Sequence, residues 1–212
     1  MRERFAHIYT AALTDVLDDH GYRNQTLPPE IRPLQAGMRL AGQAFTVEGR
    51  PTDTEDWDAA VRKTLAMLGS VPAGHVAVYQ CNHDVSAHFG ELSATSLATR
   101  GVAGCVIDGG CRDVRFIVEE RFPVFARFRT PEDSTWRWQV TATQVPIEIG
   151  RVRVDPGDWV VGDEDGVVVV PQDVAAQVLA EAEQKAQTEN AIRDAVREGV
   201  LPLDAYERYG TF

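Results

Sequence analysis

Three charged residues lie at the two ends of one stretch of the chain, at a spacing that could build a small-molecule site. Glu91 follows a glycine at the start of a predicted helix, and the pair Arg112 and Asp113 follows an apolar run that ends in "DGGC". A guanidinium suits a carboxylate or enolate oxygen, and an aspartate is a hard oxygen ligand for Mg²⁺ or Mn²⁺. If the chain returns on itself between these ends, both carboxylates and the guanidinium share one pocket with the free N–H groups of Leu92 and Ser93.

Such a pocket could hold a divalent cation and a 2-oxo acid. The cation would act as a Lewis acid on the keto oxygen, while Arg112 offsets the negative charge of the developing enolate. A structural interpretation stands beside this one: Glu91 is then a helix-start carboxylate, and Arg112 and Asp113 form a loop salt bridge in which Asp113 caps the next helix. The residues alone leave both interpretations open.

A second group of possible metal ligands lies just upstream, in the sequence "CNHDVSAH". It contains Cys81, His83, Asp84 and His88. Their spacing matches no common zinc pattern, and a helical HExxH is missing. The mismatch favours histidines that line the pocket or lie on the surface over a zinc site.

The cysteines indicate reduced thiols. Cys81, Cys105 and Cys111 are an odd number with no CxxC pair, so neither a disulfide framework nor a structural zinc site is predicted. Cys111 lies beside Arg112, whose charge could lower the pKa of the thiol and make it reactive.

Charge and motif content exclude several classes of function. The 212 residues carry 32 acidic and 21 basic side chains, a net charge of -11, which disfavours binding to nucleic acid or to an anionic membrane. The apolar runs are strand-sized and no signal peptide is recognisable, so we expect a cytoplasmic protein. The phosphate loop, the dinucleotide-binding GxGxxG and the GxSxG elbow are missing from the sequence, which argues against nucleotide hydrolysis, dinucleotide redox chemistry and triad hydrolysis.

The periodicity of apolar residues predicts a single α/β domain over residues 1–212, because helices and buried strands alternate through its first two thirds. From residue 138 onward, short strands with Pro-Gly and Asp-Gly turns indicate an antiparallel meander. Helices are expected over residues 6–20, 53–68, 91–100, 113–122 and 172–198, with an acidic cap at 53–56, and strands over 43–49, 74–81, 102–107 and 123–128.

The last predicted helix, 172–198, has an apolar stripe in its first half and a nearly all-polar middle over 183–190. A long helix with a polar middle is typical of one that leaves its own domain and reaches a neighbouring subunit. In "STWRWQV", Trp136 and Trp138 should point to opposite faces of a strand, one into the core and one to a rim.

The stretch "GELSATSLATRGVAGCVIDGGCRDV" resembles the signature of the RraA-like family, which includes 4-hydroxy-4-methyl-2-oxoglutarate aldolases and regulators of ribonuclease E activity. Glu91, Arg112 and Asp113 fulfil its acidic-x20-Arg-Asp spacing. The resemblance covers most of the chain, because "ALTDVLDDHGY", "IRPLQAGMRLAGQAFTV", "DEDGVVVVP" and "AIRDAVREGVLPLDAY" also look like family segments.

This resemblance implies a compact α/β/β sandwich, similar to swivelling domains, with a long C-terminal helix. It also implies assembly into a trimeric ring, or a dimer of trimers, with sites between subunits. The implied activity is that of a class II aldolase and decarboxylase that uses Mg²⁺ or Mn²⁺. Such an enzyme cleaves 4-hydroxy-2-oxo acids to pyruvate and decarboxylates oxaloacetate through a metal-bound pyruvate enolate.

By the same resemblance, Asp113 would bind the metal, Glu91 would act on its water shell, and Arg112 would hold the keto oxygen. The residues that would bind substrate are Gly90, Leu92, Ser93 and Arg112. Glu189, in "QTENAIR", is the best match to an acidic residue that the family brings from a neighbouring subunit's C-terminal helix. A solvated glutamate on an exposed helix is the alternative interpretation of Glu189.

The chain departs from the aldolase pattern in three places. Phe116 stands where aldolase members tend to have an acidic residue, Glu91 stands where many have aspartate, and the segment "PTDTEDWDAA" is unlike its usual counterpart. These departures leave the substrate open. The alternative function is that of a non-catalytic binding protein, like the ribonuclease E regulators, in which an acidic surface meets a basic partner.

Overall fold

A single large sheet organises the protein in the computed structural model, which describes residues 1–53 and 56–212. Within the described residues nine strands form this sheet, in the order β1-β6-β5-β3-β2-β10-β11, with β4 paired to β5 and β7 paired to β2. Its strands are β1 (Arg32–Pro33), β2 (Leu40–Pro51), β3 (His75–Gln80), β4 (Ala87–Phe89), β5 (Gly104–Cys111), β6 (Val124–Arg129), β7 (Trp138–Thr143), β10 (Trp159–Asp163) and β11 (Gly166–Val170).

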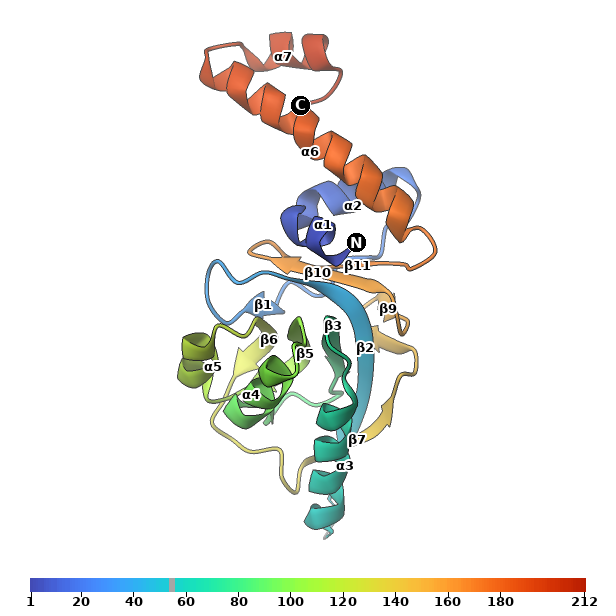
Figure 1. The fold of residues 1–212 in the computed structure, drawn as a ribbon, viewed down its shortest axis with the longest axis vertical. Coiled ribbons are helices and arrows are strands. Elements are labelled where there is room, and N and C mark those ends of the chain that lie inside the picture. Colours follow the sequence, from blue (N-terminus) through green and yellow to red (C-terminus); the bar gives the residue numbers. More distant parts are fainter. Residues whose placement is uncertain (54–55) are drawn as a thin grey trace.

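The twelve-residue strand β2 joins the parallel and antiparallel halves of the sheet (Figure 1). It pairs in parallel with β3, and β3, β5 and β6 continue in parallel, as expected for strands joined by helices. On its other side β2 pairs antiparallel with β10 and β7. The predicted change from parallel to antiparallel pairing near residue 138 is confirmed.

Three apolar layers cover the sheet. Helices α3 (Trp57–Ser70), α4 (Glu91–Thr99) and α5 (Val114–Glu120) pack on one face through buried residues such as Leu68, Leu97 and Ile117. The hairpin of β8 (Ile147–Ile149) and β9 (Val152–Val154) covers a second cluster with Val78 and Val106. This arrangement confirms the predicted α/β/β architecture.

The third layer lies on β10 and β11, where α1 (Arg2–His7), α2 (Thr10–Asp19) and the start of α6 (Ala175–Arg197) bury a cluster that contains Phe5, Leu17 and Leu179. Beyond this cluster α6 projects away from the sheet and meets α7 (Pro202–Tyr209), as Figure 1 shows. The prediction of a long C-terminal helix is confirmed. No helix in the described part of the chain is both long and apolar enough to cross a bilayer.

The single helix predicted over residues 6–20 is wrong, because the chain forms two helices with an extended break at Ile8 and Tyr9. The cause is a long-range contact that local periodicity cannot show. The Asp163 carboxylate, at the end of β10, accepts hydrogen bonds from the Thr10 backbone N–H (2.8 Å) and hydroxyl (2.7 Å). It therefore satisfies an N-terminal donor of α2 in place of a local cap.

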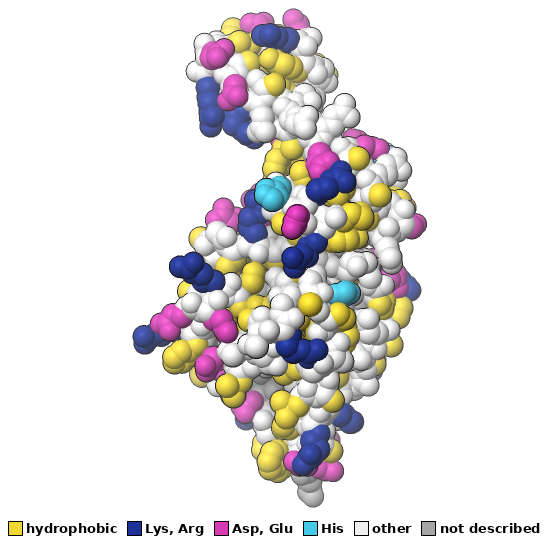
Figure 2. All heavy atoms as spheres, in the orientation of Figure 1, with side chains coloured by type: hydrophobic (Ala, Val, Ile, Leu, Met, Phe, Trp, Pro, Cys, Tyr) yellow, Lys and Arg dark blue, Asp and Glu magenta, His cyan; other side chains and the backbone are white. Residues whose placement is uncertain are grey.

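The helix predicted over 53–68 forms as α3, which begins at Trp57 and is capped by Asp56 through a hydrogen bond from the Ala59 N–H (3.0 Å). Residues 54 and 55 of the predicted acidic cap lie outside the described residues. Leu68 is buried, whereas Trp57 and Leu65 are 46% and 61% exposed. Hydrophobic side chains reach the surface at the end of the molecule where α3 lies (Figure 2).

The strand predicted over residues 102–107 is longer than expected, because β5 continues through Gly109 and Gly110 to Cys111. A Cβ at Gly109 would lie 2.5 Å from the His88 ring, and one at Gly110 would lie 2.6 Å from the Phe128 ring. These glycines let a strand pass close to aromatic side chains, and they extend the strand to the site.

Gly49 offers a test of the packing between β2 and β7. A Cβ at Gly49 would lie 1.9 Å from the buried Trp138 ring, whereas one at Gly69 on α3 has only Arg100 nearby, at 3.8 Å. We expect Gly49→Ala to lower the free energy of unfolding by about 1–3 kcal/mol through overpacking. The matched variant Gly69→Ala should raise it by about 0.4–1 kcal/mol, because alanine restricts the unfolded chain. Denaturant titration followed by tryptophan fluorescence measures both, and equal effects would contradict this packing.

Candidate active site

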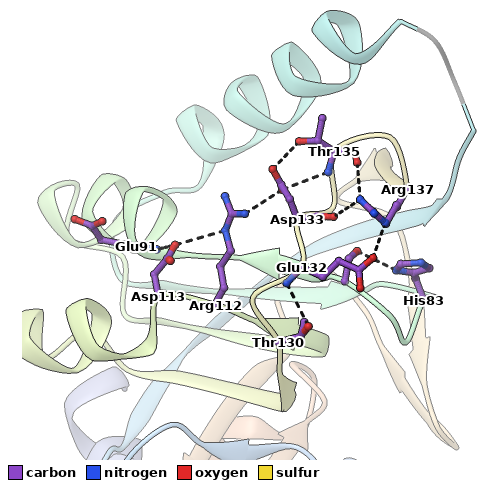
Figure 3. A network of polar contacts seen from close by, with 10 residues as sticks. His83, Glu91, Arg112, Asp113, Thr130, Glu132, Asp133, Thr135 and Arg137 are labelled. Carbon is purple, nitrogen blue, oxygen red and sulfur yellow. Dashed lines mark hydrogen bonds and ion pairs between the residues drawn. The ribbon is translucent and has the colours of Figure 1, made fainter.

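The two ends of the stretch 90–113 meet because the short strand β4 pairs in parallel with the end of β5. Phe89 is opposite Cys111, and the Arg112 N–H donates to the Phe89 carbonyl at 3.0 Å. The start of α4 and the residues after β5 therefore lie side by side (Figure 3). The predicted return of the chain is confirmed, although the register that produces it involves a strand that the sequence analysis missed.

Asp113 turns its carboxylate toward α4 and away from the helix that it precedes. It has a positive φ of 57°, and its side chain makes no capping hydrogen bond to α5. Its Oδ2 instead accepts from the Glu91 backbone N–H at 3.4 Å and lies 3.5 Å from the Arg112 Nε. Of the structural interpretation, the side-chain cap is therefore wrong, whereas the loop salt bridge between Arg112 and Asp113 is present.

Gly90 permits this arrangement. A Cβ at this position would lie 2.7 Å from Asp113 Oδ2 and 3.2 Å from Arg112 Cγ. Any side chain here would displace the carboxylate or the arginine, so the glycine forms part of the cradle around them.

Arg112 lies between two carboxylates. Its Nη1 is 3.5 Å from an oxygen of Asp133, in the loop before β7, and its side chain remains 37% exposed. Partial burial raises the pKa of Asp133, but hydrogen bonds from Thr135 and the charge of Arg112 outweigh this effect and bring the pKa below its usual value. Asp133 is thus an ionised residue of the site that the sequence analysis missed. Its only local signal is the Asp-Ser-Thr spacing of a side-chain turn.

Glu91 contributes its backbone rather than its side chain to this cluster. In Figure 3 its carboxylate points away from the side chains of Arg112 and Asp113. The neighbouring residues Leu92 and Ser93 line the same cavity as Gly90, Arg112 and Asp113. The structure thus brings five of the predicted site residues together, and joins Glu91 to them through its N–H.

The cavity at this cluster has a volume of about 230 Å³ and two different walls. One wall is largely polar and consists of Gly90, Leu92, Ser93, Arg112, Asp113, Asp133, Ser134 and Thr135. The opposite wall is largely apolar and comes mainly from α3, and it consists of Trp57, Ala60, Val61, Thr64, Leu65 and Leu68. Trp136 also lines the cavity at half exposure, whereas Trp138 is 4% exposed, so the predicted division of the two tryptophans between rim and core is confirmed.

His88 borders the cavity as a neutral side chain. Its Nδ1 accepts the Gly110 N–H at 3.2 Å, so its proton lies on Nε2, 3.1 Å from Nδ1 of His83. Burial is the main cause, and the nearby His83 a smaller one, that together lower the pKa of His88 to about 3. Among the described residues no three His, Cys, Asp or Glu side chains converge as a metal site, so the zinc interpretation gains no geometric support.

The suggestion that Cys111 is reactive is wrong. Its side chain is buried, and burial together with the charge of Asp113 raises the pKa of the thiol to about 12. Arg112 lies beside it in sequence, but the guanidinium points to Asp113 and Asp133 instead. The thiol is thus a core group.

Glu189 lies on α6, and Figure 1 shows α6 at the opposite end of the molecule from α3. It does not line the cavity of its own chain among the described residues. It accepts a hydrogen bond from the Tyr9 hydroxyl. Burial is the main cause, and this hydrogen bond the next, that raise the pKa of Tyr9 to about 12. Phe116 is 49% exposed on α5 and does not line the cavity among the described residues.

The donor set fits a hard divalent cation that keeps much of its hydration. Mg²⁺ is usually held by one or two carboxylates together with waters and substrate oxygens. Asp113 meets this need, because its side chain is 42% exposed and is cradled against Gly90 at the cavity. Substrate or water would then supply the other oxygen ligands of the cation.

Comparison with known proteins assigns the family. The model of the RraA-like family, described as Aldolase/RraA, matches residues 10–169. A protein of Halalkalibacterium halodurans named "Putative 4-hydroxy-4-methyl-2-oxoglutarate aldolase" is 34% identical over 96% of this chain and 91% of its own length. The chain therefore belongs to the RraA-like family.

Solved structures agree with this assignment. The chain resembles a protein from Pseudomonas syringae pv. tomato, with a TM-score of 0.88 and 32% identity over 98% of this chain and 92% of the other. It also resembles Streptomyces coelicolor RraAS2, described as an unusual member of the RNase ES inhibitor RraA family. That match has a TM-score of 0.83 and 28% identity over 91% of this chain and 96% of the other.

The low pKa of His88 predicts a loss of stability in acid. As the pH falls below about 6.5 the unfolded chain takes up a proton on this histidine, whereas the folded chain does so only near a pH of about 3. The unfolded state thus binds more protons within this window, and stability falls with pH. Relative to a His88→Asn variant, which keeps an acceptor for Gly110, the protein should lose about 2 kcal/mol more between about pH 6.5 and pH 5.

Urea denaturation at both pH values measures this difference. The variant serves as the control for all other titrating groups, because only residue 88 differs. Identical pH dependence in the two proteins would contradict the assigned neutral state of His88.

Proposed function

We propose that the protein is a divalent-metal-dependent aldolase and decarboxylase of pyruvyl compounds. It would cleave 4-hydroxy-2-oxo acids to pyruvate and decarboxylate oxaloacetate. The observation that carries the proposal is the convergence of Gly90, Arg112 and Asp113, with the start of α4, on one cavity. The name of the Halalkalibacterium halodurans relative supports the same reaction class.

The start of α4 binds the pyruvyl carboxylate. The first intrahelical bond runs from the Ala94 N–H to the Gly90 carbonyl at 3.1 Å, and the Glu91 N–H is directed to Asp113. The N–H groups of Leu92 and Ser93 have no intrahelical acceptor at this position and are available to an anion. They orient the substrate so that its keto oxygen is directed toward Arg112.

Asp113 would hold the cation, which would supply Lewis-acid polarisation of the keto oxygen. Arg112 offsets the negative charge that develops on that oxygen as the carbon–carbon bond breaks. Asp113 and Asp133 fix the guanidinium from two sides at 3.5 Å, which reduces the reorganisation needed in the transition state.

In aldol cleavage a base removes the proton of the 4-hydroxyl group, and the electron pair of the C3–C4 bond passes into the enolate of pyruvate. The base in this proposal is Glu189 of a neighbouring copy. The Glu91 carboxylate points away from Arg112 and Asp113 (Figure 3), and Glu189 does not line the cavity of its own chain among the described residues. Oxaloacetate needs no such base, since it loses CO₂ directly.

Oxaloacetate therefore tests the residues of the chain's own cavity. With Mg²⁺ present, the protein should release pyruvate from oxaloacetate faster than the metal alone, and Arg112→Ala or Asp113→Ala should lower the rate about 100-fold or more. The matched control is Arg115→Ala, since Arg115 is 82% exposed and pairs with Glu119 outside the cavity. Unchanged rates in the first two variants would refute the proposal.

The shared site predicts complementation between two inactive variants. Arg112→Ala and Glu189→Ala proteins should each fail to cleave 4-hydroxy-4-methyl-2-oxoglutarate, because each lacks one part of every site. When they are unfolded together and refolded, mixed assemblies should contain some sites with both residues and regain pyruvate release. Assemblies that contain both chains but show no regained activity would contradict a role for Glu189 across subunits.

A further inference from the structure

The wall opposite Arg112 differs in chemistry from the rest of the cavity. Trp57 and Leu65 are 46% and 61% exposed on α3, and Trp136 is 50% exposed on the loop before β7. The rings of Trp57 and Trp136 lie 6.0 Å apart between centroids, tilted by 58°, so they form an aromatic pair at the cavity. We call Trp57, Val61, Leu65 and Trp136 the apolar wall.

The charged side chains that line the cavity pair with one another. Arg112 is the only cation among the described lining residues, and Asp113 and Asp133 both pair with it. The remaining titratable group, His88, is neutral because burial lowers its pKa to about 3. Among this chain's own lining residues, the start of α4 thus provides the donors for one substrate carboxylate.

A second carboxylate on the substrate would meet an unfavourable environment. Away from the start of α4 it would face either the apolar wall, whose donors are the indole N–H groups of Trp57 and Trp136, or the loop that contains Ser134, Thr135 and the ionised Asp133. None of these residues is a cation that could offset its charge. Loss of hydration without a compensating partner disfavours an anion at such a place. An aromatic or branched alkyl group would gain from the same contact, since aromatic rings favour tilted or offset packing on other rings.

From this arrangement we propose that the distal group of the substrate is apolar and uncharged. The preferred substrates are 4-hydroxy-2-oxo monocarboxylates with an aryl or branched alkyl group at C4. The inference rests on the proposed function, and it names the substrate class of that site. The carboxylate end lies at Leu92 and Ser93, and the apolar end lies against Trp57, Leu65 and Trp136.

A balanced reaction can be written for the phenyl member of this class. 4-Hydroxy-2-oxo-4-phenylbutanoate loses its hydroxyl proton to a base, and the C3–C4 bond breaks with its electron pair entering the enolate. The enolate takes up one proton at C3. The products are benzaldehyde and pyruvate, and the reaction needs no oxidant, reductant or second substrate.

The test compares kcat/KM for this compound with kcat/KM for the dicarboxylate 4-hydroxy-4-methyl-2-oxoglutarate, with Mg²⁺, by the release of pyruvate. The expected preference for the phenyl compound is about tenfold or more, the size of effect that one apolar contact gives in a binding pocket. Leu65→Arg places a cation in the apolar wall and should lower this ratio about tenfold. Leu203→Arg is the matched control, because Leu203 is 67% exposed on α7 outside the cavity, and it should leave the ratio unchanged.

Two further measurements, the rate of oxaloacetate decarboxylation and the molar mass of the protein in solution, distinguish a wrong substrate class from a wrong function and from a contact between copies. A ratio of one or less, with oxaloacetate still decarboxylated, overturns the substrate class and leaves the proposed function standing. No turnover of any of the three compounds overturns both. If Leu65→Arg changes the molar mass but not the ratio, the wall is a contact between copies of the chain, and the proposal is again overturned.

Discussion

The parallel pairing of β4 with β5 is the constraint on which the candidate site depends. It places Phe89 opposite Cys111, so that Gly90 and Arg112 become neighbours although twenty-one residues separate them in sequence. Gly109 and Gly110 allow β5 to continue to this point, because a Cβ at either position would collide with the ring of His88 or of Phe128. The absence of a side chain at Gly90 then lets the Asp113 carboxylate approach α4. One register thus brings the start of α4 and the Asp113 carboxylate together.

The helices on that face of the sheet give the cavity its asymmetry. Helix α4 contributes a polar end with free N–H groups, whereas α3 contributes an apolar wall whose side chains are only partly buried. The segment "PTDTEDWDAA", which departs from the usual family pattern, leads directly into this wall at Trp57. Of this segment, Trp57 and Ala60 line the cavity.

Much of the fold was predictable because it depends on local patterns. Alternating helices and valine-rich strands predicted the parallel half of the sheet, and Pro-Gly and Asp-Gly turns predicted the antiparallel half. The features that were missed depend on distant contacts. Asp163 interrupts the first helix by binding Thr10, and Asp133 reaches Arg112 from a loop twenty-one residues further along the chain. The Glu91 side chain also points away from Arg112 and Asp113 (Figure 3), a direction that its position at a helix start does not predict.

Stabilisation of the pyruvate enolate by Arg112 and Asp113, as proposed here, can be measured without knowing the natural substrate. Pyruvate and Mg²⁺ in D₂O should lose the methyl proton signal of pyruvate faster with the protein than with Mg²⁺ alone, because enolate formation exchanges those protons. An Asp113→Asn variant, which keeps the shape of the side chain but removes its charge, should return the rate to that of the metal alone. Exchange at the same rate with the protein, with the variant and with Mg²⁺ alone would contradict the account.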